Sequence, residues 1–376
     1  MKKVSKYLSI IIIGCLSILF NSCNSSKDMP IAIGVLTPLT GDGANYGRST
    51  KEGIDLAVEE INSENYLDKP LKIIYEDDKI SPTDGVSAIN KIISVDKVPL
   101  IIGPFGSSVT LAVAPIANKN KVIIIGASAT ADNIKDAGDY VFRITPPNSK
   151  QGRDVATFCI DKLKTKRAAI IYQNNDYGVT LKSAFENNFK HLGGEITISE
   201  GVDLGIKDLK TQILKIKGGH PDVVFFPLHI AESGILLKQS KELGLNAKFI
   251  SCDGAMVDDL LNVAGDAAEG TYYTSLALGY GVSDSLINKF IESFKMKYKK
   301  EPDVYAAYYY EVTKIVAYSI KNAGYKADSI KKFLYSIQGM LSYKGITGIT
   351  NFDSNGEVDK SFSIYVVDNG KFELFK

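Results

Sequence analysis

The fold is decided by residues 46–62, with the sequence YGRSTKEGIDLAVEEIN. They follow an apolar run at residues 31–36 and a glycine-rich turn. The run has the length and β-branched content of a buried strand, and the apolar side chains of the quoted stretch recur at the spacing of one helix face. A strand, a loop and an amphipathic helix therefore open the globular part of the chain.

The same alternation continues along the chain. Short β-branched runs predict strands at residues 31–36, 71–76, 100–103, 122–126, 168–172, 195–199, 223–226 and 248–251. Helical spacing predicts helices at residues 53–62, 83–94, 109–118, 150–163, 178–192, 206–217, 232–243 and 256–264. Such alternation predicts parallel sheets with helices on both faces, and so many units predict two lobes of similar build. We expect the first crossover at Pro146 and Pro147, because two prolines can continue neither element.

The length, charge balance and cysteine content of the chain limit the number of domains and the kinds of partner that can be expected. The chain has 376 residues and 45% hydrophobic content, which suits two globular domains. Without the three lysines of residues 1–22, 41 of the 44 basic side chains remain against 43 acidic ones. Such a near-neutral balance gives no reason to expect nucleic acid or an electrostatic membrane surface as a partner. Cys159 and Cys252 are the two cysteines of the body, and we expect two buried thiols rather than a disulfide.

The N-terminus has the pattern of a secretory signal peptide at residues 1–22. Lysines form a positive start, residues 7–20 form an apolar run, and Ser22 places a small residue before Cys23. The run is too short to be a comfortable membrane-spanning anchor.

We therefore predict that Cys23 becomes a lipidated N-terminus and that residues 23–29 form a polar tether on the extracytoplasmic side of a bacterial membrane. Cys15 also fits a lipidation motif, but cleavage there leaves only about seven apolar residues before it, at the lower limit for a signal peptide. An ordinary free cysteine at position 23 is the other alternative.

The quoted stretch closely resembles the start of the branched-chain amino-acid (Leu/Ile/Val-type) substrate-binding proteins of ABC transporters, which are type I periplasmic binding proteins. The resemblance is carried by Tyr46 and Gly47, then Gly53, and by the C-terminal segment at residues 343–356. It covers the chain from residue 30 onward.

The resemblance implies an α/β fold of two Rossmann-like lobes with parallel sheets, joined by a three-strand hinge that permits closure about a crevice. Lobe 1 would comprise residues 30–145 and 274–350, and lobe 2 residues 146–273 and 351–376, with edge strands after residue 362. Relatives often carry a disulfide near the first-lobe crevice. The matching positions are Ile80 and Gly106, so that bridge is absent here.

Ligands of open parallel sheets sit beyond the carboxyl ends of the strands. Ser107 and Ser108 follow one such strand at a helix start, where free N–H groups and the helix dipole favour a carboxylate. Ser128, Ala129 and Thr130 follow the next strand. A threonine at position 130 can turn its amide toward a carboxylate and its hydroxyl oxygen toward an ammonium group. The resemblance implies that Ser107, Thr130 and the Ser128 carbonyl bracket an α-amino acid in this way, whereas the local pattern alone also allows helix capping.

Asp253 ends another strand and is followed by Gly254. In the family an acid at this position binds the ammonium group of the ligand through a charge-assisted hydrogen bond. The family's usual Glu is Asp here. An ordinary turn-forming Asp-Gly pair is the alternative reading.

Aromatic side chains are expected to shape the rest of the pocket. The resemblance places Tyr46, Phe105 and Tyr177 at ligand positions, and His229 where relatives often carry an aromatic. Tyr305 is a weaker candidate. No lysine or arginine occupies a matched pocket position, which points to a ligand with a neutral apolar or aromatic side chain.

An enzyme is disfavoured, because the sequence has no GxGxxG after its first strand, no phosphate-binding loop, no nucleophile elbow and no metal-ligand pattern. We expect a monomeric protein without cofactor or metal that captures a free neutral amino acid and delivers it to an ABC permease. One alternative keeps the fold but binds an aromatic acid, an amide or another small solute. The other is a ligand sensor that signals to a receptor.

Overall fold

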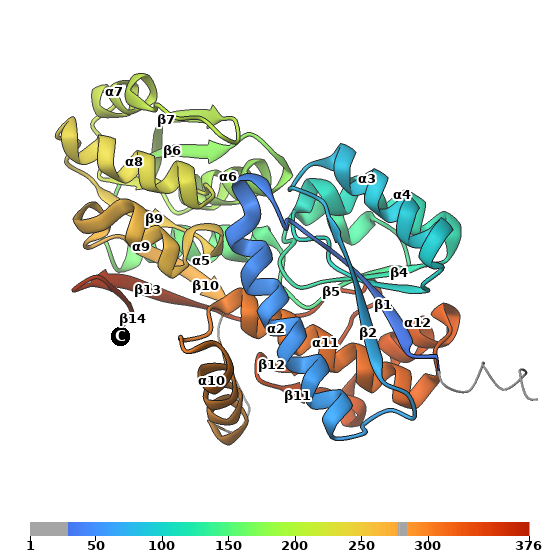
Figure 1. Cartoon of the computed structure of the whole chain (residues 1–376). Helices are drawn as coiled ribbons and strands as arrows, with labels where there is room; N and C mark the ends of the chain where they lie inside the picture. The colour runs from blue at the N-terminus through green and yellow to red at the C-terminus, as the bar shows by residue number, and fades with distance from the viewer. Residues whose placement is uncertain (1–28, 277, 279–283, 376) are drawn as a thin grey trace, which may run out of the picture.

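The computed structural model describes residues 29–276, 278 and 284–375 (Figure 1). The predicted signal peptide and Cys23 lie outside the described residues. No helix in the described ranges is long and apolar enough to cross a membrane.

Lobe 1 is built on a parallel five-stranded sheet in the order β2-β1-β3-β4-β5. Its strands are β1 (Ile31–Thr37), β2 (Leu71–Asp77), β3 (Leu100–Ile102), β4 (Ile123–Gly126) and β5 (Val141–Arg143). Every residue of β3 and β4 is buried, as expected for central strands covered on both faces. This burial explains why both strands could be recognised as unbroken apolar runs.

Helices cover both faces of this sheet (Figure 1). One face packs on α3 (Pro82–Lys91) and α4 (Ser107–Asn120). The other packs on α2 (Ala44–Ser63) and α11 (Val304–Ala323). Three further elements complete the lobe, namely α10 (Asp284–Tyr298), α12 (Ala327–Ser336) and the hairpin of β11 (Tyr343–Gly345) and β12 (Gly348–Thr350).

Lobe 2 is built on a seven-stranded sheet in the order β14-β13-β10-β9-β8-β6-β7. Its parallel strands are β6 (Arg167–Gln173), β7 (Glu195–Val202), β8 (Val223–Phe225), β9 (Lys248–Ser251) and β10 (Tyr272–Leu276). The edge strands β13 (Phe362–Asp368) and β14 (Lys371–Leu374) are antiparallel. One face packs on α5 (Asn148–Asp161) and α6 (Asp176–His191), and the other on α7 (Lys210–Gly218), α8 (Ile230–Glu242) and α9 (Asp258–Ala264).

The predicted fold class of two α/β lobes with parallel sheets is confirmed. The chain passes between the lobes after β5, after β10 and after β12, and the middle passage lies partly outside the described residues. The expected boundary at residues 273 and 274 falls inside β10, which pairs with β13 of lobe 2 along its whole length.

Local departures from the predicted elements have local causes. The short strand β5 was not predicted, because three residues directly before the Pro146-Pro147 crossover carry too little pattern. The helix predicted from residue 206 begins at Lys210, since the Leu209 amide donates to the Gln239 side chain (2.7 Å) instead of extending the helix backwards. Cys159 and Cys252 are both free and buried.

Candidate functional site

A cavity of about 420 Å³ lies between the two lobes, at the carboxyl ends of their strands. Lobe 1 contributes the start of α4 and the loop after β4, and lobe 2 contributes the start of α6 and the turn after β9. Seven of the ten residues predicted to bind a ligand line this cavity: Phe105, Ser107, Ser128, Tyr177, His229, Asp253 and Tyr305. Its volume is at the small end of the range for small-molecule pockets.

The other three predicted residues lie directly behind the cavity wall. The Tyr46 ring stacks on Phe105 with centroids 4.7 Å apart and meets the Tyr305 ring edge-on at 5.4 Å. Ala129 and Thr130 are buried in the loop after β4. These three residues therefore support the lining rather than form it.

Ser107 has a specific hydrogen-bonding role. Its Oγ accepts from the backbone amides of Thr130 and Ala131, both at 3.1 Å. A serine hydroxyl has two acceptor sites and one donor, so its proton remains available for an acceptor in the cavity. The alternative of helix capping does not hold, because Gly106 is the N-cap of α4 and no side chain caps this helix.

Thr130 differs from its expected geometry. Its amide was expected to face a ligand carboxylate, but it donates to Ser107 Oγ. Its own hydroxyl is fully buried and has no hydrogen-bond partner among the residues that the structure describes. The sequence pattern located the loop correctly but could not give the direction of its peptide groups.

Asp253 is the most unusual group of the cavity. It is 1% exposed, and its Oδ1 accepts from Gln151 Nε2 at 2.9 Å. Burial raises the pKa of Asp253 to about 6, although the Gln151 amide and nearby backbone amides oppose the shift. Within the described part of the chain no cationic side chain compensates this carboxylate. A buried anion without a partner is costly, so the site is suited to a cation that comes with the ligand.

Gln151 was not singled out from the sequence. It lies in the first turn of α5, just after the first crossover, and also donates to Thr274 Oγ1 (3.1 Å). Only the tertiary structure brings this turn beside the end of β9. The lining residues Ile80, Pro82, Leu204, Asn174, Asn175 and Asp176 were likewise not assigned to the site.

His229 is an uncharged part of the wall. Burial lowers its pKa to about 4, so the imidazole is neutral near pH 7. Its ring stacks on Tyr177 with centroids 5.5 Å apart. The site therefore combines the buried Asp253 carboxylate, and the Asp176 carboxylate paired with Ser108 at the rim, with neutral aromatic and polar groups.

Hydrogen bonds across the crevice show that the lobes are closed. The Tyr46 hydroxyl of lobe 1 donates to the Gly254 carbonyl (2.5 Å) and accepts from the Ile230 amide (3.1 Å), both in lobe 2. At the rim, Ser108 Oγ donates to Asp176 Oδ2 (2.6 Å). Polar groups of both lobes thus satisfy one another only in this closed arrangement.

The Ile80 and Gly106 positions, where the resemblance implied a missing disulfide, do lie together. A β-carbon on Gly106 would be 3.1 Å from Ile80 Cγ2. The Ile80 side chain therefore lies beside the Gly106 backbone, at the place where the resemblance implied a bridge in relatives.

The proteins that resemble this chain in sequence and those that resemble it in structure are of the same kind. A family model described as periplasmic binding protein matches residues 30–371. The Leu/Ile/Val-binding protein homolog 2 of Brucella abortus is 29% identical over 92% of this chain and 93% of its own length. The leucine-, isoleucine-, valine-, threonine- and alanine-binding protein of Pseudomonas aeruginosa is 28% identical over 97% of both chains.

A similar solved structure is the leucine binding protein LivK of Thermotoga maritima, with a TM-score of 0.86 and 28% identity over 92% of this chain and 98% of that one. A match of this extent, together with the two-lobed fold and the crevice between the lobes, identifies the family. The chain belongs to the periplasmic binding proteins, among the branched-chain amino-acid type I members that its sequence resembles.

Proposed function

We propose that this protein is a lipid-anchored solute-binding protein that captures a free neutral amino acid, branched-chain or aromatic, and delivers it to an ABC importer. The observation that carries the proposal is the buried Asp253 carboxylate, which lacks a cation in the described chain and borders a closed cavity of about 420 Å³. An α-ammonium group would supply that cation.

The opposite end of the ligand would be held by lobe 1. Ser107 has a hydroxyl proton to donate and lies at the start of α4, where the helix dipole favours a carboxylate. Phe105, Tyr177 and Tyr305 would then surround the side chain. This division of roles assigns the ligand carboxylate to lobe 1 and its ammonium to lobe 2, so the ligand itself would stabilise the closed form.

A thermal-shift screen against the twenty amino acids and a panel of aromatic acids, amides and polyamines tests the proposal. A ligand at one hundred times its Kd should add about 2.7 kcal/mol to the free energy of unfolding. A response confined to leucine, isoleucine, valine or phenylalanine supports the proposal. A response only to an acid without an amino group would contradict the role of Asp253 and favour the aromatic-acid alternative.

The pH dependence of affinity gives a second test. Asp253 must be ionised to bind an ammonium group, and its pKa in the ligand-free protein is about 6. We expect Kd to rise about tenfold between pH 7 and pH 5, because the ionised fraction falls by that factor. Calorimetry at both pH values measures the change.

Asp78 provides the control for that measurement. It is also buried, with a pKa raised to about 6 by burial, but it does not line the cavity. The Asp78→Asn variant should keep the tenfold dependence. Loss of the dependence in this variant would transfer the effect from Asp253 to Asp78.

Tyr46→Phe should weaken binding by specifically destabilising the closed form. Removal of the hydroxyl leaves the Gly254 carbonyl and the Ile230 amide without their partner on closure. We expect a loss of about 1–3 kcal/mol in binding free energy, measured by calorimetry. Tyr310→Phe is the matched control, because the Tyr310 hydroxyl bonds to Glu60 within lobe 1. Equal losses in the two variants would refute a role in closure.

A further inference from the structure

Arg143 is a buried cation at the junction between the ligand-binding loop and the hinge. It is the last residue of β5, directly before the first crossover, and is 1% exposed. Its Nη1 donates to the Ala131 carbonyl (2.9 Å) and makes a longer contact with the Ala129 carbonyl (3.5 Å). Its Nη2 donates to Glu357, in the third crossover at residues 351–361. The Arg143 side chain thus connects the loop after β4 to the third crossover.

The loop is held from two sides. Its amides at Thr130 and Ala131 donate to Ser107, on the side of the ligand cavity. Its carbonyls face the hinge, where Thr130 accepts from the Asn148 amide (2.8 Å) and its neighbours accept from Arg143. A displacement of the hinge can therefore reach Ser107 through a single peptide segment.

The backbone next to Glu357 is held against the end of β5. The Arg143 amide donates to the Gly356 carbonyl (3.0 Å), and Gly356 has a φ of +73°. A β-carbon on Gly356 would also lie 2.6 Å from the Val141 carbonyl oxygen, so the crossover passes very close to β5. A buried guanidinium needs its counter-ion, so Arg143 favours the hinge position in which Glu357 meets it.

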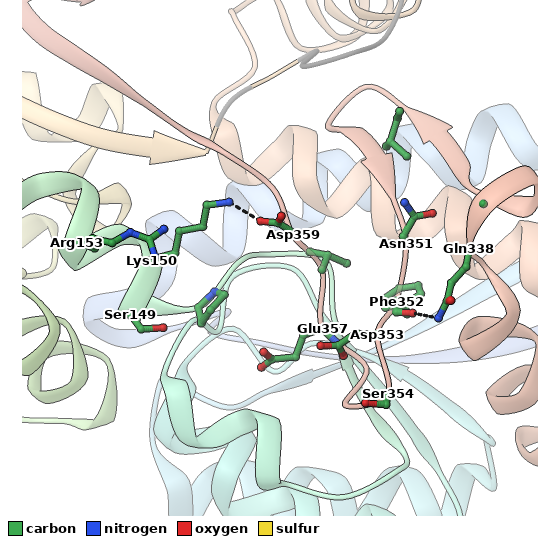
Figure 2. Close-up of a pocket in the computed structure, with 14 residues that line it drawn as sticks. Ser149, Lys150, Arg153, Gln338, Asn351, Phe352, Asp353, Ser354, Glu357 and Asp359 are labelled. Carbon is green, nitrogen blue, oxygen red and sulfur yellow. Dashed lines mark hydrogen bonds and ion pairs between the residues drawn. The ribbon is translucent and has the colours of Figure 1, made fainter. Parts of the chain in front are cut away.

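A second ion pair on the same crossover does not reach the loop. Figure 2 shows Lys150 of α5 paired with Asp359 at the hinge cavity, which is about 1000 Å³ in volume and is also lined by Glu357. The Asp359 side chain is 91% exposed, and exposed pairs contribute little. This pair is therefore a matched comparison for Arg143 and Glu357.

We propose that Arg143 is a positioning residue that couples the ligand-binding loop at residues 128–131 to the third crossover through Glu357. Occupation of the site at Ser107 would then stabilise the closed hinge, and opening of the hinge would loosen the loop. The proposal rests on the proposed function in that the loop is taken to belong to the ligand site.

Hydrogen–deuterium exchange of the ligand-free protein tests the coupling without any ligand. In Arg143→Lys and Glu357→Gln we expect the Thr130 and Ala131 amides to exchange at least about tenfold faster, with the central amides of β1 unchanged. Lys150→Met should leave the loop amides at their original rates. Unchanged loop exchange in Glu357→Gln overturns the proposal even where Arg143→Lys fails to fold, and acceleration by Lys150→Met overturns it equally.

Leucine affinity provides the second readout. If the unaltered protein binds leucine in calorimetry, Glu357→Gln should raise Kd at least about tenfold and Lys150→Met less than about twofold. Faster loop exchange with an unchanged Kd would overturn the coupling to binding. If the unaltered protein does not bind leucine, that result counts against the proposed function and not against the coupling. The role of Arg143 is then decided by the exchange experiment.

Discussion

Asp253→Asn should abolish amino-acid binding and, at the same time, stabilise the ligand-free protein. The variant removes the negative charge but keeps an oxygen that can accept from Gln151. Loss of the charge leaves the ligand ammonium buried without a counter-ion, which costs about 3–5 kcal/mol and raises Kd more than a hundredfold. Calorimetry with the amino acid found in the thermal-shift screen measures this loss.

The gain in stability follows from the raised pKa. Burial moves the pKa of Asp253 from its ordinary value of 3.8 to about 6 in the folded protein. The favourable contribution of Asp253 to the free energy of unfolding is therefore fully present below pH 3.8 and is lost as the pH rises through 6. At pH 7 the ionised carboxylate costs the ligand-free protein up to about 3 kcal/mol. We expect the variant to melt at a higher temperature than the unaltered protein at pH 7 and at the same temperature near pH 4.

An exposed acid distinguishes this effect from a general loss of negative charge. Asp359 is 91% exposed, so Asp359→Asn should leave both affinity and melting temperature nearly unchanged. An Asp253→Asn variant that bound its amino acid as tightly as the unaltered protein would show that Asp253 is only a turn residue. The opposing effects on stability and affinity are typical of a site that keeps a destabilising group for its function.

Prediction from the sequence succeeded where one short segment carries the information. Ser107 and Asp253 could be predicted to lie near each other because each stands in the segment after a buried strand, and the ends of parallel strands meet at one edge of a sheet. Both line the cavity, and their roles toward a ligand stay predictions. The prediction that Tyr46 belongs to the pocket rested on the family resemblance, since an aromatic on a helix is usually a core residue, and Tyr305 was a weaker candidate. The fold could be predicted for the same reason, because buried parallel strands are continuous apolar runs.

Prediction failed where a contact joins distant segments. Gln151 meets Asp253 across 102 positions of sequence, and Arg143 meets Glu357 across 214. Neither glutamine nor arginine at a helix or strand end has a local pattern that reveals its partner. The Thr130 amide was placed on the correct loop but given the wrong partner, because peptide orientation depends on the hydrogen bonds that surround the loop.

Gly53→Ala should strongly destabilise the protein, although alanine is the better helix former. A β-carbon at position 53 would lie 2.1 Å from the carbonyl oxygen of Ala306 and 3.0 Å from its Cα. These are backbone atoms of α11, so no side chain can rotate away, and α2 and α11 must separate. We expect a loss of about 2–3 kcal/mol in the free energy of unfolding, measured by chemical denaturation, after the usual helix gain of about 1 kcal/mol.

The same substitution at Gly218 is the matched control. Gly218 ends α7, and a β-carbon there would have no atom within 4 Å. Gly218→Ala should therefore be neutral or stabilising by up to about 1 kcal/mol. Gly53→Ala should in addition weaken ligand binding, because α2 carries Tyr46 and α11 carries Tyr305, whose rings meet at the cavity. Equal stability of the two variants would mean that the two helices separate without cost. The close crossing at Gly53 would then have no part in shaping the site.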